Sequence, residues 1–467
     1  MGFWFSPSLP VFDTPTSSSY NSDLRSVGLY LCHLVPLIKE DGEEPHMKPR
    51  ERVISSLNHE KPGKVPLDLG SSLITGIHVS SLHKLKVSLG LIQPDEPVKV
   101  IDPFQMLGEV DHDLRKALGV DTIPLEPIKN LFGFENKNWK RWTFFDGTPL
   151  LVPEKFNTEP DKSGYIYQYP QGDTSVPPCA QIPQNGFYFD CIIRQKPLPA
   201  NGRLTVEDQI EEYEILSDND LLYYERESKR LYEETDYAII SGGVPGINPG
   251  DIAFVPGPAL KDPKGIRDVE EWYISLIDRT DFVKDVFTRM TEIGLKNLEL
   301  FHQAVGERVQ VIIVSGADFG AQDAPFLSPE LYRELFKPFH RRINNWIHKN
   351  TTWKTFIHTC GSVYDLLPDM KEEGFDILNP VQISAAKMNP AQLKREFGDH
   401  FTFWGGGVNT QKTLPFGTPE EVRHEVKSLM ETLKTGGGFV FNTVHNIQAK
   451  VPVENLLALF ETVNEYR

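Results

Sequence analysis

Short runs of apolar residues, separated by longer amphipathic stretches, recur along the chain from residue 47 onward. Most of these runs are continuous rather than alternating, which is typical of parallel strands that are buried on both faces of a sheet. We expect eight strands, at residues 65–69, 122–125, 238–242, 309–315, 354–359, 376–380, 401–405 and 438–443.

Signals for helix starts lie between the later expected strands. Ser328 and Thr418 are each followed by proline and glutamate, so that an N-cap residue, a first-turn proline and an acidic residue stand together. Residues 47–57 have helical spacing, and residues 452–467 form an amphipathic pattern that closes the chain. Strands that alternate with helices predict an α/β fold, namely a (β/α)8 TIM barrel, and the alternative is a doubly wound sheet.

Two stretches depart from this alternation. Residues 138–202 are rich in tryptophan, tyrosine and phenylalanine, with prolines and glycines at the turns. This pattern predicts β-hairpins inserted after an early barrel strand, either as a packed subdomain or as a lid over an apolar or planar ligand.

Residues 1–46 are rich in serine, proline and aspartate, so we expect a peripheral or poorly ordered extension ahead of a barrel domain at 47–467.

The composition narrows the class of protein. A chain of 467 residues with 39% hydrophobic and 24% charged residues is typical of a globular protein with a sizeable core. The formal net charge of −17 argues against nucleic acid and anionic membranes as partners. The 4 cysteines are too few for a disulfide framework, and no apolar run reaches the length of a membrane span, so we expect a cytoplasmic protein.

The strand expected at 354–359 carries two residues that are common metal ligands. His358 and Cys360 lie two positions apart, so in a strand both side chains point to one side. An imidazole and a thiolate suit zinc when one or two further ligands come from elsewhere in the chain. A His-x-Cys spacing also occurs between residues that bind no metal, so the zinc interpretation depends on a further ligand from elsewhere in the chain.

Polar residues follow the other expected strands, and in a barrel these strand ends meet at one mouth. His445 follows the eighth strand, which favours a metal site because neighbouring strand ends lie side by side. We expect Asp318 and Gln322, after the fourth strand, to be catalytic groups that orient a ligand or bound substrate. The residues expected to bind substrate follow or end the sixth and seventh strands: Asn379, Gln382, Trp404 and Asn409.

Several strings in the sequence resemble the uroporphyrinogen decarboxylase superfamily. They are Arg50-Glu-Arg-Val-Ile, Val65-Pro-Leu-Asp-Leu-Gly70, Asp318-Phe-Gly, Ser328-Pro-Glu-Leu-Tyr-Arg-Glu, His358-Thr-Cys360-Gly361 and Phe403-Trp-Gly-Gly. The likeness is greater to the branch of corrinoid-dependent methyltransferases, which includes the methylcobamide:coenzyme M methyltransferases, and it covers residues 47–467. The resemblance implies a TIM barrel and zinc held by the His-x-Cys pair and a later cysteine.

The chain departs from that family pattern at the third ligand. Where the relatives have a cysteine after the last strand, this chain has His445, and no cysteine follows Cys360. We therefore expect zinc at His358, Cys360 and His445. Such a site has one thiolate instead of two and keeps a net positive charge, so bound zinc is a stronger Lewis acid. A stronger Lewis acid suits a substrate in which a methyl group departs from oxygen or nitrogen. It is less suited to activating a thiol that accepts the methyl group.

Three functions are compatible with these features. The first is a zinc-dependent methyltransferase that moves a methyl group between a small substrate and the corrinoid (cobalamin) of a partner protein, since the chain has no cobalamin-binding Asp-x-His-x-x-Gly string. A porphyrinogen decarboxylase is disfavoured because residues 70–78 lack the arginines that would bind substrate carboxylates. A non-catalytic small-molecule binder would have no need of a thiolate beside an imidazole. Methoxylated aromatics, methylamines, methanol and thiols are all candidate substrates, and O-demethylation of a methoxy compound is preferred.

Overall fold

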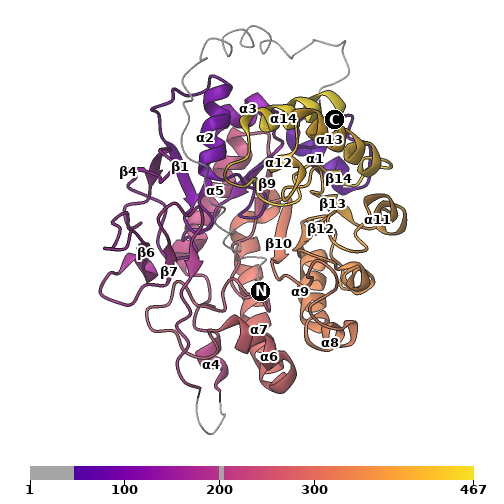
Figure 1. Ribbon diagram of the computed structural model, residues 1–467. Coiled ribbons are helices and arrows are strands. Elements are labelled where there is room, and N and C mark those ends of the chain that lie inside the picture. The colour runs from indigo at the N-terminus through magenta and orange to yellow at the C-terminus, as the bar shows by residue number, and fades with distance from the viewer. Residues whose placement is uncertain (1–46, 199–203) are drawn as a thin grey trace. The chain divides into compact units, whose positions relative to one another are not determined.

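The computed structural model of the chain describes residues 47–198 and 204–467 (Figure 1). The extension expected at 1–46 lies outside these described residues, as do residues 199–203 of the expected insertion. Residues Lys48–Arg467 group into one unit. Within the described residues, no helix is long and apolar enough to cross a membrane.

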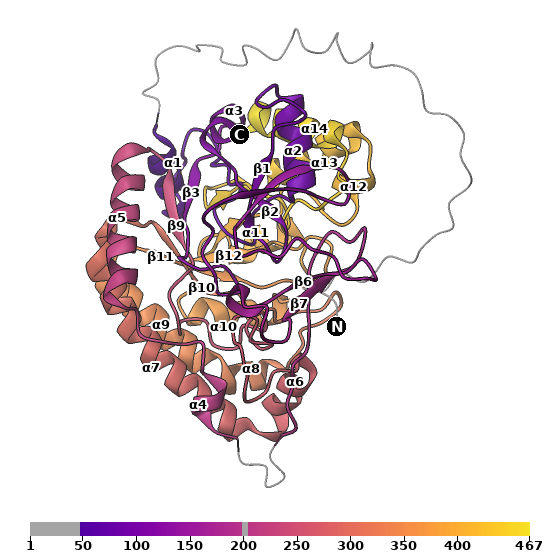
Figure 2. The same ribbon diagram turned by 90° about the vertical axis from the view of Figure 1, so that its left-hand side faces the viewer.

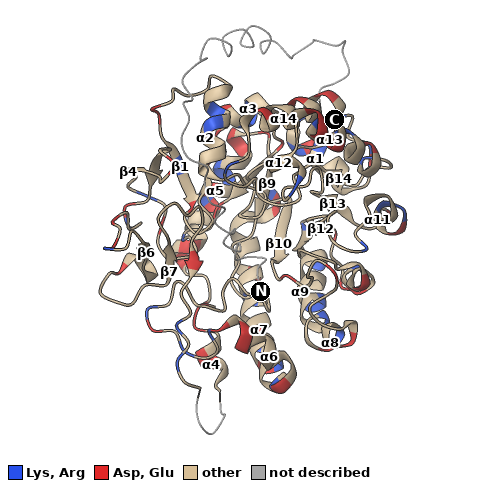
Figure 3. Cartoon of the chain, viewed as in Figure 1, with Lys and Arg blue, Asp and Glu red and all other residues tan. Residues whose placement is uncertain are grey.

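A seven-stranded sheet forms the centre of this unit, in the order β14-β13-β12-β11-β10-β9-β3, and every neighbouring pair in it is parallel. Each strand lies within a run that the sequence predicted, because short apolar runs can be buried on both faces inside a parallel sheet. Figure 3 shows the charged residues concentrated on the helices and loops around these strands. The strands are β3 (Thr122–Leu125), β9 (Ala238–Ser241), β10 (Val311–Ser315), β11 (Lys354–His358), β12 (Ile377–Asn379), β13 (Thr402–Trp404) and β14 (Phe439–Val440).

The expected first strand, residues 65–69, joins this sheet through one isolated parallel bridge, Leu67 with Phe441. On one side, Asp68 N donates to Phe441 O over 2.8 Å; on the other, Asp121 N donates to Leu67 O over 2.8 Å. These two partners adjoin β14 and β3, the edge strands, so the sheet curls until both edges flank the same segment. The observed architecture is thus a curled parallel sheet of TIM type, and the described residues do not form the closed ring of eight regular strands that we expected.

Helices cover the outside of the sheet and connect its strands (Figure 2). Helices α5 and α7 pack against each other, as do α7 and α9, and α13 packs against α14. The helices are α1 (Pro49–Leu57), α2 (Val79–Ser88), α3 (His112–Leu118), α4 (Val206–Gln209), α5 (Asp218–Glu234), α6 (Val269–Asp278), α7 (Thr280–Val305), α8 (Pro329–Leu335), α9 (Lys337–Asn350), α10 (Leu367–Glu372), α11 (Pro390–Phe397), α12 (Thr413–Phe416), α13 (Pro419–Leu433) and α14 (Val453–Tyr466).

The helix starts predicted at Ser328 and Thr418 are confirmed. Ser328 Oγ accepts a hydrogen bond of 3.2 Å from Leu331 N at the start of α8. Thr418 Oγ1 accepts from Glu421 N over 3.3 Å, and the Glu421 carboxylate accepts from Thr418 N over 2.7 Å, which forms a capping box at the start of α13. These starts were predictable because each cap involves only residues within one helical turn.

Two smaller sheets lie in the N-terminal half of the unit, on the left of Figure 1. One has the order β2-β1-β5-β4, and the other has the order β6-β7-β8. The sequence did not predict β1 and β2, because β1 alternates buried and half-buried residues and has no continuous apolar run. Their strands are β1 (Val98–Asp102), β2 (Leu107–Gly108), β4 (Lys140–Thr143), β5 (Pro149–Val152), β6 (Ile166–Gln168), β7 (Ala180–Ile182) and β8 (Asp190–Cys191).

The stretch predicted as an insertion forms antiparallel hairpins, β4 with β5 and β6 with β7. Its aromatic side chains pack against one another: Trp142 contacts Phe156 at 5.4 Å between ring centroids, and Phe156 contacts Phe189 at 5.8 Å. Strand β5 also pairs in parallel with β1, which precedes β3 in the chain. The hairpins therefore share a sheet with chain outside the predicted insertion, and a lid role for them remains a prediction.

Candidate metal centre

The carboxyl end of β11 and the segment after β14 bring two imidazoles and one thiol together. His358 is the last residue of β11, and its Nε2 lies 3.5 Å from the Sγ of Cys360. The ring of His445 approaches the ring of His358 with centroids 5.4 Å apart. One potential ligand atom from each of the three residues lies within 4.8 Å of the others. The structure therefore places together the three residues that the sequence singled out for zinc.

The imidazole of His358 is oriented by Asn379, the last residue of the neighbouring strand β12. Asn379 Nδ2 donates to the carbonyl oxygen of Trp404 over 2.7 Å, which leaves Oδ1 of the same amide facing the imidazole. His358 Nδ1 lies 2.6 Å from this Oδ1 and must donate to it, because an amide oxygen only accepts. The proton of a neutral His358 is therefore on Nδ1, and Nε2, which lies 3.5 Å from Cys360 Sγ, carries the lone pair that can bind a metal.

Asp318 and Gln382 hold the turn that carries Cys360. Asp318 Oδ1 accepts from the backbone N–H of Cys360 over 2.8 Å, and Gln382 Oε1 accepts from the backbone N–H of Gly361 over 2.7 Å. Asp318 Oδ1 also lies 3.9 Å from His358 Nε2. Both side chains accept from backbone N–H groups of the turn after β11, so they hold the turn that carries Cys360.

Two glycines allow the loops after β10 and β11 to touch backbone to backbone. A Cβ on Gly361 would lie 2.1 Å from Gly320 O, and a Cβ on Gly320 would lie 2.7 Å from Ser362 N. Gly361 also has φ +87°, a conformation that side chains other than glycine rarely adopt. The position of Cys360 thus depends on a contact that a side chain at either glycine would block.

Burial keeps both imidazoles neutral. It lowers the pKa of His358 to about 3, with the neighbouring His445 adding to the effect, and it lowers the pKa of His445 to about 4. Burial also raises the pKa of the Cys360 thiol, and so does the charge of Asp318. A neutral imidazole is the form that binds a metal, and a bound cation stabilises a thiolate. The donors, their spacing and their protonation therefore fit a zinc ion with an imidazole, thiolate and imidazole as protein ligands.

The other residues that the sequence proposed for the site take different positions. Asn379 and Gln382 support the cluster, as described above. The Trp404 indole is fully buried and donates to Asp68 Oδ2 over 2.8 Å. Asn409 Oδ1 accepts from two backbone N–H groups of its own turn, those of Gln411 and Lys412. The side chain of Gln322 is partly exposed, and only its backbone carbonyl has a described bond, from Ala386 N. Substrate binding by Trp404 or Asn409 and catalysis by Gln322 remain predictions.

Asp68 is a buried residue of the central sheet that the sequence did not propose for the site. Its carboxylate accepts from Thr122 Oγ1 over 2.6 Å and from Trp404 Nε1 over 2.8 Å, so it joins side chains of β3 and β13. Burial raises its pKa. The string 65–70 that carries the family resemblance contains Asp68, and a carboxylate inside an apolar run was the signal that could have identified it.

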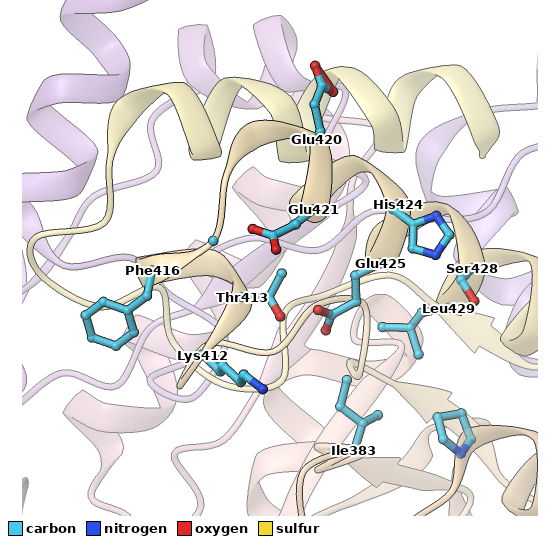
Figure 4. A pocket seen from close by; sticks show the side chains of 12 residues that line it. Ile383, Lys412, Thr413, Phe416, Glu420, Glu421, His424, Glu425, Ser428 and Leu429 are labelled. Carbon is cyan, nitrogen blue, oxygen red and sulfur yellow. The ribbon is translucent and has the colours of Figure 1, made fainter.

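A separate recess of ≈ 820 Å³ lies between the starts of α11, α12 and α13 (Figure 4). It contains no thiol, and none of the three clustered residues lines it. Two of its carboxylates serve the backbone: Glu421 caps α13, and Glu425 Oε1 accepts from Asn409 N over 2.8 Å. Ile383 in the wall of the recess directly follows Gln382, whose side chain accepts a hydrogen bond from Gly361 N in the turn that carries Cys360. The candidate metal ligands are therefore His358, Cys360 and His445, and not residues of this recess.

A curled parallel α/β sheet with two imidazoles and a thiol beyond the carboxyl ends of its strands defines the class as a TIM-type protein with a candidate metal centre. Residues 262–466 match the uroporphyrinogen decarboxylase (URO-D) family. The matched residues include β10 to β14 and the whole cluster. The resemblance that the sequence motifs indicated is confirmed.

The relatives include methyltransferases and decarboxylases. The chain is 28% identical over 181 residues to the methylcobamide:CoM methyltransferase MtaA of Methanosarcina barkeri, covering 37% of this chain and 51% of that protein. It is 35% identical over 79 residues to the uroporphyrinogen decarboxylase of Pseudoalteromonas translucida, covering 17% and 22% of the two chains. The similarity thus spans about half the length of the methyltransferase and less of this decarboxylase.

A solved structure supports the fold over a larger part of the chain. The structure described as a methyltransferase from Methanosarcina mazei superimposes with a TM-score of 0.50 and covers 90% of this chain and 99% of the other. The two sequences are 17% identical, so this similarity concerns the fold alone.

Proposed function

We propose that the protein is a zinc-dependent methyltransferase that moves a methyl group between a small methylated substrate and the corrinoid of a partner protein. The observation that carries the proposal is the cluster of His358, Cys360 and His445 within 4.8 Å at the strand ends of a URO-D-type fold. The similarity to methylcobamide:CoM methyltransferases supports the choice of methyl transfer over other reactions of that family.

Zinc bound by these three residues would act as a Lewis acid that withdraws electron density from the substrate heteroatom attached to the methyl group. The chain's own residues prepare the site for it. Asn379 directs the Nε2 lone pair of His358 toward the cluster, and Asp318 holds the turn of Cys360. His445 is partly accessible while the other two are buried, so the open side of the cluster lies next to His445. A substrate heteroatom would approach from that side.

The third ligand favours a particular kind of substrate. A site with one thiolate keeps a net positive charge, which favours departure of a methyl group from oxygen or nitrogen more than activation of a thiol. We therefore infer a methoxy compound as the preferred substrate class, with O-demethylation as the reaction. The partner protein would present the reduced corrinoid at the same opening, because the methyl group passes directly from one atom to the other.

The test begins with metal analysis of the purified protein, for which we expect one zinc per chain. The zinc-loaded protein is then mixed with a corrinoid protein in the reduced state and with methoxylated aromatics, methylamines, methanol or methyl thioethers in turn. Methylation of the corrinoid, followed by its absorption spectrum, should depend on zinc and be fastest with a methoxy compound. A protein that binds no zinc, or that methylates the corrinoid from none of these donors, would contradict the proposal.

A further inference from the structure

The residues that follow His445 pair with a segment from the N-terminal half of the chain. Ile447 N donates to Gly76 O over 2.9 Å, and His78 N donates to Ile447 O over 2.8 Å. These two bonds define a parallel bridge between Ile77 and Ile447. The third candidate metal ligand therefore lies two residues before a short parallel ladder, and its position depends on what holds that ladder in place.

Asn446, which directly follows His445, uses its whole side-chain amide in hydrogen bonds. Its Oδ1 accepts from Gly76 N over 2.6 Å. Its Nδ2 donates to Leu73 O and to Gln105 Oε1, each over 2.9 Å. Asn446 is 1% exposed, so bulk water does not compete for these bonds. Three hydrogen bonds of one buried amide thus fix the residue next to His445.

Gln105, in the turn between β1 and β2, continues the same network. Its Nε2 donates to Leu73 O over 2.9 Å and to Asp102 Oδ2 over 3.0 Å, while its Oε1 accepts from Asn446. Asp102 ends β1 and is buried, and its Oδ1 accepts from Phe104 N over 3.1 Å. The carboxylate accepts at one end of the network, so every amide nitrogen along it donates and every amide oxygen accepts.

The two sides of His445 are held by different parts of the chain. On the preceding side, Val444 N donates to Val408 O over 3.2 Å, in the loop that follows β13. On the following side, Asn446 is bonded to the turn after the first expected strand and to Gln105. These partners on the following side lie outside residues 262–466, which match the URO-D family. The N-terminal half therefore contributes to the position of the third ligand without supplying a ligand itself.

We propose that Gln105 and Asn446 are positioning residues of the metal centre. They form a relay of hydrogen bonds from the buried carboxylate of Asp102 to the backbone beside His445, and this relay sets where the third ligand lies. The inference rests on the proposed zinc site and extends it to residues of the N-terminal half. Because the relay has a fixed direction, each amide position requires a group that both donates and accepts.

Gln105→Leu tests the relay by removing the donor and the acceptor from a side chain of similar size. Its zinc affinity, measured by competition with a chromogenic chelator, should fall about tenfold, as is usual for residues that support a metal ligand. Gln93→Leu, at an exposed glutamine that precedes β1, is the matched control and should keep the wild-type affinity. Equal affinities in Gln105→Leu and the wild type would overturn the proposal.

A rescue experiment tests the direction of the relay. Gln105→Glu places a carboxylate oxygen against Asp102 Oδ2, so its zinc affinity should also fall. The double variant Asp102→Asn with Gln105→Glu should recover affinity, because the new amide of residue 102 donates to the new carboxylate, which still accepts from Asn446. Gln93→Glu adds the same charge at the exposed position and should have no effect. A double variant that binds zinc as weakly as Gln105→Glu would overturn the relay.

Cobalt(II) in place of zinc separates a displaced ligand from a lost fold. The visible absorption bands of cobalt(II) depend on the number and geometry of its ligands, so they should change or disappear in Gln105→Leu while its circular dichroism stays that of the wild type. Wild-type bands in Gln105→Leu would overturn the positioning role and leave the proposed zinc site and methyl transfer intact. A wild-type protein that binds no zinc would contradict both proposals.

Discussion

The imidazole of His358 and the side-chain amide of Asn379 are joined by a hydrogen bond of 2.6 Å between Nδ1 and Oδ1. Replacement of Asn379 by alanine removes the group that keeps the His358 Nε2 lone pair directed at Cys360. We expect the zinc affinity of Asn379→Ala to fall about 10–100-fold, as is usual when the partner of a metal-binding histidine is lost. Competition with a chromogenic chelator measures this affinity.

Asn409→Ala is the matched control for that experiment. Asn409 was also predicted for the site, but its side chain bonds only to backbone groups of its own turn among the contacts described. Its loss should leave the zinc affinity unchanged. Equal losses in the two variants would mean that the amide of Asn379 has no special role in orienting His358.

His445 should be the third zinc ligand, and its replacement tests this directly. His445→Ala leaves two ligands, so the purified variant should lose its zinc and its methyl transfer together while its circular dichroism stays that of the wild type. His445→Cys should keep the metal but slow demethylation of an oxygen donor, because a second thiolate reduces the Lewis acidity of zinc. His424→Ala, at an exposed position on α13, is the control. Stoichiometric zinc in His445→Ala would show that another residue holds the third position.

Gly361→Ala should disrupt the site through a steric clash rather than through backbone conformation alone. The new Cβ would lie 2.1 Å from Gly320 O, and we expect a loss of unfolding free energy of about 4 kcal/mol or more. Gly63→Ala is a close control, because Gly63 has φ +74° but nothing within 4 Å of the added Cβ. It should cost about 1 kcal/mol, the cost of the left-handed conformation. Denaturant unfolding compares the two, and equal losses would show that the Gly320 contact is unimportant.

The protein should release no carbon dioxide from uroporphyrinogen. The segment 70–78 that follows the first expected strand contains no arginine to bind the carboxylates of that substrate. Trapping of labelled carbon dioxide from carboxyl-labelled uroporphyrinogen measures the reaction, with a dedicated decarboxylase as the positive control. Turnover comparable to that control would overturn the methyltransferase assignment.

Asp251→Asn should raise stability above pH 6 and have little effect in more acidic solution. Burial raises the pKa of Asp251 from 3.8 to about 6, so between these values the folded protein holds a proton that the unfolded chain has lost. Wild-type stability therefore falls as the pH rises through this window, and asparagine, which cannot ionise, avoids the loss. Thermal melting of both proteins across the window measures the difference. A constant difference at every pH would show that ionisation of Asp251 is not its cause.

Local sequence features determined most of the secondary structure around the sheet. The strands β3 and β9 to β14 were predictable because continuous apolar runs require burial on both faces, and the starts of α8 and α13 were predictable because their caps involve neighbouring residues. The spacing of His358 and Cys360 likewise placed both side chains on one side of a strand end.

Only the tertiary structure decided how close these residues and segments lie to one another. The distance from His445 to His358 depends on how far the sheet curls, which no local pattern encodes. The pairing of β1 with β5, the Gly320–Gly361 contact and the position of Asp251 over Gly316 all join segments that are distant in the chain. The sequence specifies which residues are apolar, polar or able to bind a metal, but the packing of whole strands and loops sets the distances on which the chemistry depends.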